Sequence, residues 1–360
     1  MSLPTSTKPR IQFMNYLNIL ACFAVICLHC SQAVFRPEES VTWYYSVVMQ
    51  SVFIFAVPIF FMISGANLLG YQKKYSTAVF FKKRFRKTFG ALLFGSVLVY
   101  CITCFCPELF NRVPRDFSLL DFVTRFFNND IEIIYWFFYV ILALYVVVPI
   151  LSPLAESKEK LTYAIVFFAV ITAVLPLVDR YVPWFGYMLS LFGARSFTGA
   201  IMFFLLGYYV QNYAGAKRSP LACAVVFAAC VVLMVISTLV INADAVRDPA
   251  IAYDGFYASA FSIFAIGSSV SVFMLFKSCE SRFSGVSCHL RGIVQRLSSA
   301  SLGVYLIHLL IMDNIAFWVP HPWSVTMTIE PPLVYIIAVV IVMAAQASWA
   351  LVRRVLHKIV

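Results

Sequence analysis

The feature that most constrains this chain is a series of apolar runs of about 20 residues, which recur along its whole length. A helical run of that length covers the ~30 Å hydrocarbon layer of a bilayer. The runs lack the alternating pattern of membrane strands, so the sequence predicts an all-α, polytopic membrane bundle of about ten transmembrane helices. We place the spans at about 13–35, 43–70, 88–106, 133–153, 161–178, 196–213, 220–242, 255–276, 298–318 and 331–352.

Composition excludes a water-soluble fold. Of the 360 residues, 62% are hydrophobic and only 12% are charged, whereas soluble domains average about 25% charged residues. The first run, 13–35, is longer than the roughly 7–15-residue core of a signal peptide and ends in no clear cleavage site. We therefore expect it to remain as a first span, and we interpret residues 1–360 as a single membrane domain.

The basic residues predict the orientation of the bundle. With the N-terminus placed inside, 20 of the 27 Lys and Arg residues fall in inner segments and 7 in outer ones. Because short cytoplasmic loops are enriched in Lys and Arg, both termini are expected in the cytoplasm. The net charge of +11 is thus explained by the membrane, and no nucleic-acid partner is expected.

The densest basic stretch is "KKYSTAVFFKKRFRKTF", residues 73–89, in which phenylalanines alternate with cations. This pattern predicts an interfacial helix on the cytoplasmic side. One interpretation is that the cations only bind anionic lipid headgroups and fix the topology. The other is that Lys83, Arg84 and Lys87 bind a phosphate-rich ligand, since a polyanion needs several cations.

The first run carries polar groups that a lipid-facing helix would not keep. Asn18 and His29 are eleven residues apart, so they share one helical face about 16 Å apart along the axis. In the ninth run, Ser298, Ser301, Tyr305 and His308 likewise share a face. Two interpretations stay open for both stripes: hydrogen bonds between neighbouring helices, including a His308 bond to a backbone carbonyl, or a shared polar chamber.

Several stretches, taken together, resemble the acyltransferase-3 family, and most closely its surface-polysaccharide O-acyltransferase type. They occur in the family's order and at its usual span positions. They are "NYLNILACFAVICLHCS", "PIFFMISGANLL", "FFKKRFRKTF", "WFFYVILALYVVVPIL", "FFLLGYYV" and "SSASLGVYLIHLLI".

The resemblance implies a multi-pass enzyme of the bacterial plasma membrane. Such an enzyme moves an acyl group, commonly acetyl, from cytoplasmic acyl-CoA to a hydroxyl of a surface or lipid-linked glycan. His29 matches the family's essential first-span histidine, Arg84 and Lys87 match its basic pair, and His308 matches a recurrent ninth-span histidine. Two positions depart from the family: Asn18 stands where it usually has Arg, and Ile134 and Tyr135 stand where a histidine often precedes the fourth-span aromatic.

From this resemblance we expect acyl-CoA, most simply acetyl-CoA, as the donor, and no metal. Asn18, Lys83, Arg84 and Lys87 are expected to hold the donor. His29 is expected to act as the general base on the acceptor hydroxyl.

The remaining expectations concern the acceptor and the partners. Tyr305 and His308 are expected to orient the sugar or stabilise an oxyanion, and Trp136 and Tyr139 to stack on the sugar ring. The partners are membrane lipids and the glycan acceptor. The alternative is a transporter or flippase for a small solute or lipid-linked sugar, which usually carries mid-membrane carboxylates that these runs lack.

Overall fold

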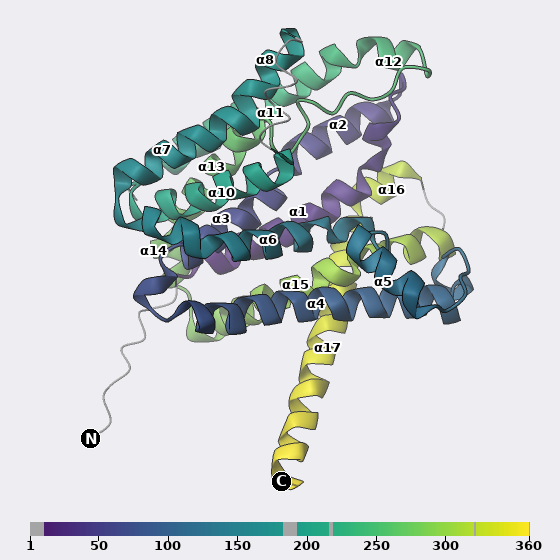
Figure 1. Ribbon diagram of the computed structural model, residues 1–360. Coiled ribbons are helices and arrows are strands. Elements are labelled where there is room, and N and C mark those ends of the chain that lie inside the picture. Colours follow the sequence, from purple (N-terminus) through teal and green to yellow (C-terminus); the bar gives the residue numbers. More distant parts are fainter. Residues whose placement is uncertain (1–10, 183–192, 216–218, 320–321, 360) are drawn as a thin grey trace.

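The computed structural model describes residues 11–182, 193–215, 219–319 and 322–359, and within them the secondary structure is helical, with no strand (Figure 1). This confirms the predicted all-α fold. The main helices are α1 (Phe13–Cys30), α2 (Val41–Phe53), α3 (Ala56–Leu68), α4 (Thr77–Phe105), α5 (Leu119–Asn128), α6 (Trp136–Leu151), α7 (Lys158–Ala169), α8 (Leu175–Tyr181), α10 (Arg195–Asn212), α11 (Pro220–Ile241), α13 (Ile263–Ser278), α15 (Cys288–Trp318) and α17 (Glu330–Ile359). Shorter helices are α12 (Ala243–Arg247), α14 (Glu280–Ser284) and α16 (Trp323–Thr328).

Eight helical segments in the described residues are long and apolar enough to cross a membrane, and each coincides with a predicted span. The other two predicted spans, 196–213 and 255–276, correspond to α10 and to α13, which is a shorter apolar helix. The membrane-spanning character of the chain is thus supported. The count of ten and the cytoplasmic placement of both termini remain predictions.

Two local expectations differ from the structure. The basic stretch 73–89 does not form a helix of its own, because Thr77 to Phe105 is one continuous helix and the cations occupy its first turns. The eighth predicted span starts too early: α13 begins at Ile263, and residues 255–262 form no regular helix. No charged residue occurs in 255–262, so apolar content alone misplaces the start of the eighth span.

Close packing of α3 against α10 depends on two glycines that face each other. A Cβ atom at Gly65 would lie 1.7 Å from the carbonyl oxygen of Phe204, and one at Gly207 would lie 2.0 Å from that of Met62. The two backbones therefore touch, as in other membrane helix pairs that use small residues at their crossing. Any side chain at either position would force the helices apart.

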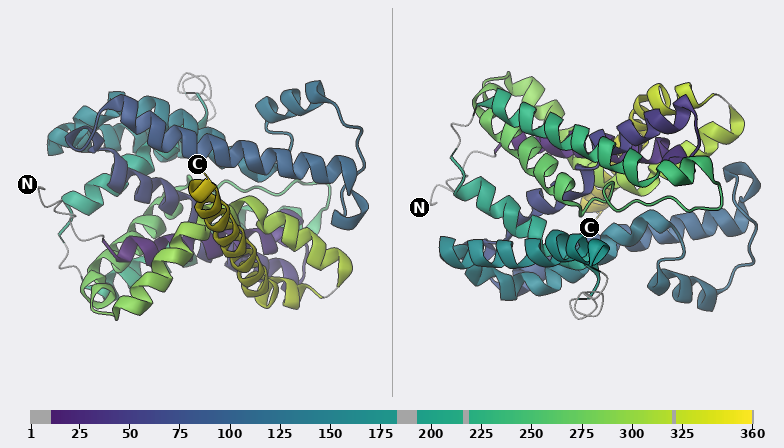
Figure 2. Two further views of the ribbon diagram at one scale, coloured as in Figure 1. Left: turned by 90° about the horizontal axis from the view of Figure 1, so that it is seen from below. Right: turned by 90° about the horizontal axis from the view of Figure 1, so that it is seen from above.

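The helices run between two ends of the bundle. We name the end that holds the start of α1, α4 and α15 the basic end, since the cations of α4 lie there. Helix α1 lies at the centre, in contact with α3 and α15, and the last part of α17 extends away from the other helices (Figures 1 and 2). The short helices α5, α12 and α16 lie at the opposite end.

Candidate active site

The polar stripes of α1 and α15 face each other. At the basic end, the Asn18 amide donates to the backbone oxygen of Ser298 at 2.9 Å, to the Ser298 hydroxyl at 3.1 Å and to the Ser301 hydroxyl at 3.0 Å. Asn18 therefore joins the two helices. Both interpretations of the stripe hold at this end, since the same three residues bond the helices and line a cavity.

At the other end of the same stripes, two imidazoles meet. The rings of His29 and His308 have centroids 5.2 Å apart. His308 is fully buried, and its Nδ1 lies 2.8 Å from the backbone oxygen of Tyr305, so Nδ1 is the protonated nitrogen of the neutral ring. Its Nε2 is buried and finds no partner among the described residues. A buried acceptor atom without a partner is uncommon in a protein interior.

His29 is half-buried, and its Nδ1 lies 3.4 Å from the side-chain nitrogen of Gln32. In this orientation the amide donates to Nδ1, and Nε2 carries the hydrogen of the neutral ring. When the amide turns over so that its oxygen faces Nδ1–H, the Nε2 atom of His29 carries the free lone pair that a general base needs. Gln32 can therefore select the tautomer of His29.

An inner cavity opens at the basic end. It consists of two adjoining hollows of ≈ 290 Å³ and ≈ 830 Å³ that share Asn18, Ser64 and Arg84 in their walls. Lys87 and Thr88 line the smaller hollow, and Lys74 lines the larger. Because its walls combine cations with amides and hydroxyls, this cavity fits an anionic, elongated ligand.

An outer cavity of ≈ 440 Å³ lies beyond the inner one. His29 lines it together with Gln32, Asp313, Trp323 and Glu330. Its polar groups are an imidazole, an amide and carboxylates, with an aromatic ring beside them. Such a set suits a neutral polyhydroxyl ligand, since sugars stack on aromatic faces and donate hydroxyl hydrogens to carboxylates and imidazoles.

A layer of rings separates the two cavities. Tyr305 lines the inner cavity, and its ring contacts that of His308, which in turn contacts His29 in the outer cavity. Phe60 and Phe137 complete the layer at 6.4 Å and 5.4 Å from the Tyr305 centroid. We name these five residues the aromatic layer. The two cavities have no lining residue in common.

Two reciprocal hydrogen bonds hold the layer in place. The Tyr305 hydroxyl donates to the backbone oxygen of Ile134 at 2.9 Å, and the Tyr135 hydroxyl donates to that of Leu306 at 3.0 Å. The hydroxyl of Tyr305 is thus already bonded to the protein. In this arrangement Tyr305 contributes its ring to the site, while His308 keeps a free acceptor atom.

The structure brings most of the expected site residues to these cavities, with four exceptions. Lys83 is exposed, and its Nζ lies 5.0 Å from the centre of the Tyr75 ring. Trp136 and Tyr139 pack against the core, and the Tyr139 hydroxyl donates to the backbone oxygen of Phe126. His308 is fully buried behind His29. None of the four lines the inner or the outer cavity.

The sequence analysis missed an ionic cluster behind the outer cavity. Arg112 forms an ion pair with Glu132 at 3.0 Å and donates to Asp313 at 3.3 Å. Burial raises the pKa of Glu132, and the guanidinium of Arg112 only partly offsets this. Glu132 and Glu330 stand just before the fourth and tenth predicted spans, and a carboxylate at a span boundary was the signal that we did not use.

One comparison with known proteins identifies the family. The family model whose description is an acyltransferase domain, acyltransferase-3, matches residues 11–348. Neither a curated protein nor a solved structure matches the chain. The match spans nearly the whole chain and covers both cavities and the histidine pair, so this membrane protein belongs to the acyltransferase-3 family.

Proposed function

We propose that this protein transfers an acyl group, most simply acetyl, from cytoplasmic acyl-CoA to a hydroxyl of a surface or lipid-linked glycan at the bacterial plasma membrane. The observation that carries the proposal is the arrangement of the cavities. A cationic cavity and a carboxylate-lined cavity lie end to end, and the His29–His308 pair is part of the aromatic layer between them.

The inner cavity supports donor binding. Arg84 and Lys87 lie one helical turn apart on α4, and both line this cavity. Cations so placed neutralise the phosphates of a nucleotide by charge-assisted hydrogen bonds. Asn18, which stands where the family usually has a basic residue, adds no charge, so the phosphates depend on the α4 cations. The narrow acyl-bearing arm then follows α1 and α15 toward Tyr305.

The outer cavity supports the chemistry. His29 Nε2 accepts the proton of the acceptor hydroxyl while the hydroxyl oxygen attacks the thioester carbonyl carbon. The C–S bond then breaks, the thiolate leaves, and it takes the proton back from His29. A positioned base of this kind contributes about 10²–10⁴-fold. The ring of His308, 5.2 Å from that of His29, supports the base from the side away from the cavity.

The aromatic layer sets a condition on this reaction. The thioester arrives on the side of Tyr305, whereas His29 lines the cavity on the other side. The rings of Phe60 and Phe137 must therefore move apart far enough for the acyl group to reach His29. A small acyl group, such as acetyl, needs the smallest displacement in a closely packed interior.

Mass spectrometry of surface glycans tests the proposal. Cells with the chain should carry an acyl mass increment on the glycan that cells without it lack, and His29→Ala should remove it. His289→Ala is the matched control, since this exposed histidine lies at the start of α15, outside both cavities. Unchanged glycan acylation in His29→Ala would overturn the proposal, and solute or lipid movement without acylation would favour a transporter.

A further inference from the structure

A third pocket lies at the opposite end from the basic end, apart from both cavities. It has a volume of ≈ 260 Å³ and lies between the last turns of α4 and the segment that leads to α5. Three arginines line it, Arg112, Arg115 and Arg125, together with Tyr100 and one carboxylate, Asp130. We name it the arginine pocket.

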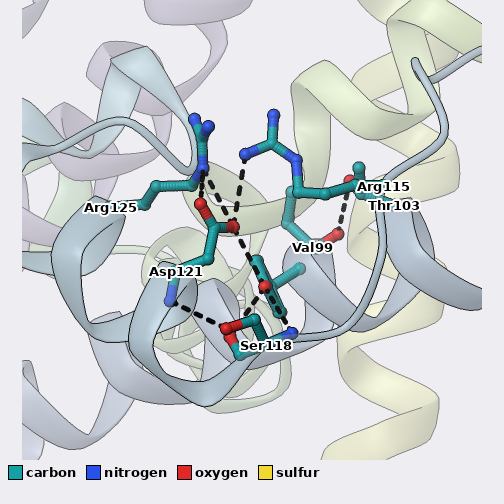
Figure 3. A network of polar contacts seen from close by, with 7 residues as sticks. Val99, Thr103, Arg115, Ser118, Asp121 and Arg125 are labelled. Carbon is teal, nitrogen blue, oxygen red and sulfur yellow. Dashed lines mark hydrogen bonds and ion pairs between the residues drawn. The ribbon is translucent and has the colours of Figure 1, made fainter.

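The arginines of this pocket have more N–H groups than the protein uses. Asp121 accepts from Arg125 Nε at 2.9 and 3.1 Å and from Arg115 Nη1 at 3.4 Å, and Figure 3 shows both guanidinium groups converging on this carboxylate. A guanidinium carries five N–H donors. Both Nη groups of Arg125 and the Nη2 of Arg115 have no further partner in the described part of the chain.

Arg112 adds to this surplus. Its Nη2 forms ion pairs with Glu132 and Asp313. Arg112 also lines the pocket beside Arg115 and Arg125, so three guanidinium groups border the same space, with Asp130 as the one carboxylate that the described residues place in its wall. The pocket therefore fits an anion with several oxygens, such as a phosphate or diphosphate, which arginines bind bidentately.

The surroundings of the pocket indicate that this anion carries an apolar tail. Helix α5 exposes Leu119, Leu120 and Phe127 by 69%, 77% and 74%, and the neighbouring Val113 is 81% exposed. In a membrane protein an amphipathic helix of this kind lies in the interface, with its apolar side chains among the acyl chains. The arginines then lie at the depth of lipid phosphates.

The arginine pocket adjoins the outer cavity. Arg112 lines the pocket, and its partner Asp313 lines the cavity that contains His29. The Arg112–Asp313 pair therefore forms a wall that both spaces share. A sugar attached to a phosphate in the pocket can extend past this pair toward His29.

We propose that the arginine pocket binds the phosphate or diphosphate of a lipid-linked sugar, and so presents the acceptor to His29 from within the outer leaflet. The part about the acceptor rests on the proposed function. The inference commits to a lipid-linked sugar as substrate, rather than to a finished polymer that arrives from water.

A binding experiment tests the site itself. The purified full chain in nanodiscs is titrated with farnesyl diphosphate, with farnesol as the uncharged probe, and with excess phosphatidylglycerol as competitor. We expect saturable binding of the diphosphate, none of farnesol, and no competition by the phospholipid. Arg115→Gln/Arg125→Gln should weaken binding at least tenfold. The control Arg36→Gln/Arg247→Gln removes the same charge from exposed arginines outside the pocket and should bind normally.

A second variant keeps the test sharp if the double arginine variant folds poorly. Asp121→Asn removes the carboxylate that competes for the same guanidinium groups, so it should bind farnesyl diphosphate more tightly than the natural chain. A purely structural network would instead lose stability and gain no affinity. Equal binding of the diphosphate by all variants, or full displacement by phosphatidylglycerol, would overturn the inference.

Two further readouts separate this inference from the proposed function. If glycan acylation requires His29 but is unchanged in Arg115→Gln/Arg125→Gln, the acceptor-site proposal is overturned and the proposed acyltransferase function stands. The opposite outcome has two parts: farnesyl diphosphate binding depends on the arginines, but the His29→Ala variant acylates normally. It would overturn the proposed role of His29 and leave the proposed binding site supported. CoA affinity should be unchanged in the arginine variant, since those residues lie far from the inner cavity.

Discussion

The inner and outer cavities are built on the same two helices, yet their chemistry differs. Helices α1 and α15 supply Asn18, Ser298 and Ser301 to the inner cavity and His29 and Asp313 to the outer one. Only the inner cavity adds the cations of α4, and only the outer one adds the carboxylate of Glu330. One helix pair can therefore line one cavity suited to an anionic ligand and another suited to a neutral sugar. The difference comes from the other helices that pack against each end of the pair.

The largest effect should come from the outer cavity. His29→Ala removes the proposed base, so the acylation rate should fall by about 10²–10⁴-fold, while the KM for acyl-CoA stays within about twofold. Thiol release from acyl-CoA by the purified protein with its acceptor gives both constants. A rise in KM at unchanged kcat would mean that His29 binds the donor. It would contradict the assignment of donor binding to the inner cavity and of the reaction to the outer one.

The next largest effect should come from the inner cavity. Arg84→Gln/Lys87→Gln removes two phosphate contacts, each worth about 1.5 kcal/mol or more, so the KM for acyl-CoA should rise by about 100-fold or more. Lys82→Gln/Arg86→Gln is the matched control, since it removes the same charge from exposed positions of α4 that do not line the cavity. Equal increases in both variants would mean that the cations act only through the general charge of the surface.

A smaller effect should mark the contact between the stripes. Asn18→Ala loses the amide that bonds to Ser298 and Ser301, and interhelical hydrogen bonds in membranes are worth about 0.6–1.7 kcal/mol. We expect a lower thermal unfolding temperature and a nearly unchanged donor KM. Unaltered stability with a raised KM would instead assign Asn18 to the donor.

The smallest effect should come from the aromatic layer. Tyr305→Phe keeps the ring and removes one hydrogen bond to the Ile134 carbonyl, which contributes about 1 kcal/mol of stability. The acylation rate should change by less than about threefold, as judged in the same thiol-release assay. A hundredfold loss would show that the hydroxyl itself acts in the reaction.

Periodicity and charge made much of this fold predictable. The spacing of Asn18 and His29, and of Ser298 through His308, correctly indicated that each set shares one helical face. What periodicity cannot give is which helix each face meets. The pairing of α1 with α15, separated by more than 250 residues in sequence, is a tertiary contact, and it alone places His29 beside His308.

The expectations for the sugar-stacking residues show the limit of aromatic content as a signal. Trp136 and Tyr139 were expected in the acceptor site, but they pack on the core, whereas Trp323 lines the outer cavity. In a chain with 17% aromatic residues, most rings fill space between helices. An aromatic side chain that binds a ligand can be told from one that only packs by whether it lines a cavity, and this is known only from the structure.

One crossed measurement tests the central claim most directly. CoA is titrated onto the His29→Ala and the Arg84→Gln/Lys87→Gln proteins in nanodiscs, and glycan acylation is measured for the same two variants. The account predicts that His29→Ala binds CoA normally but does not acylate, whereas the double variant binds CoA weakly and regains acylation at high acyl-CoA. Loss of CoA binding in His29→Ala, or full acylation by it, would contradict the separation of donor binding from chemistry.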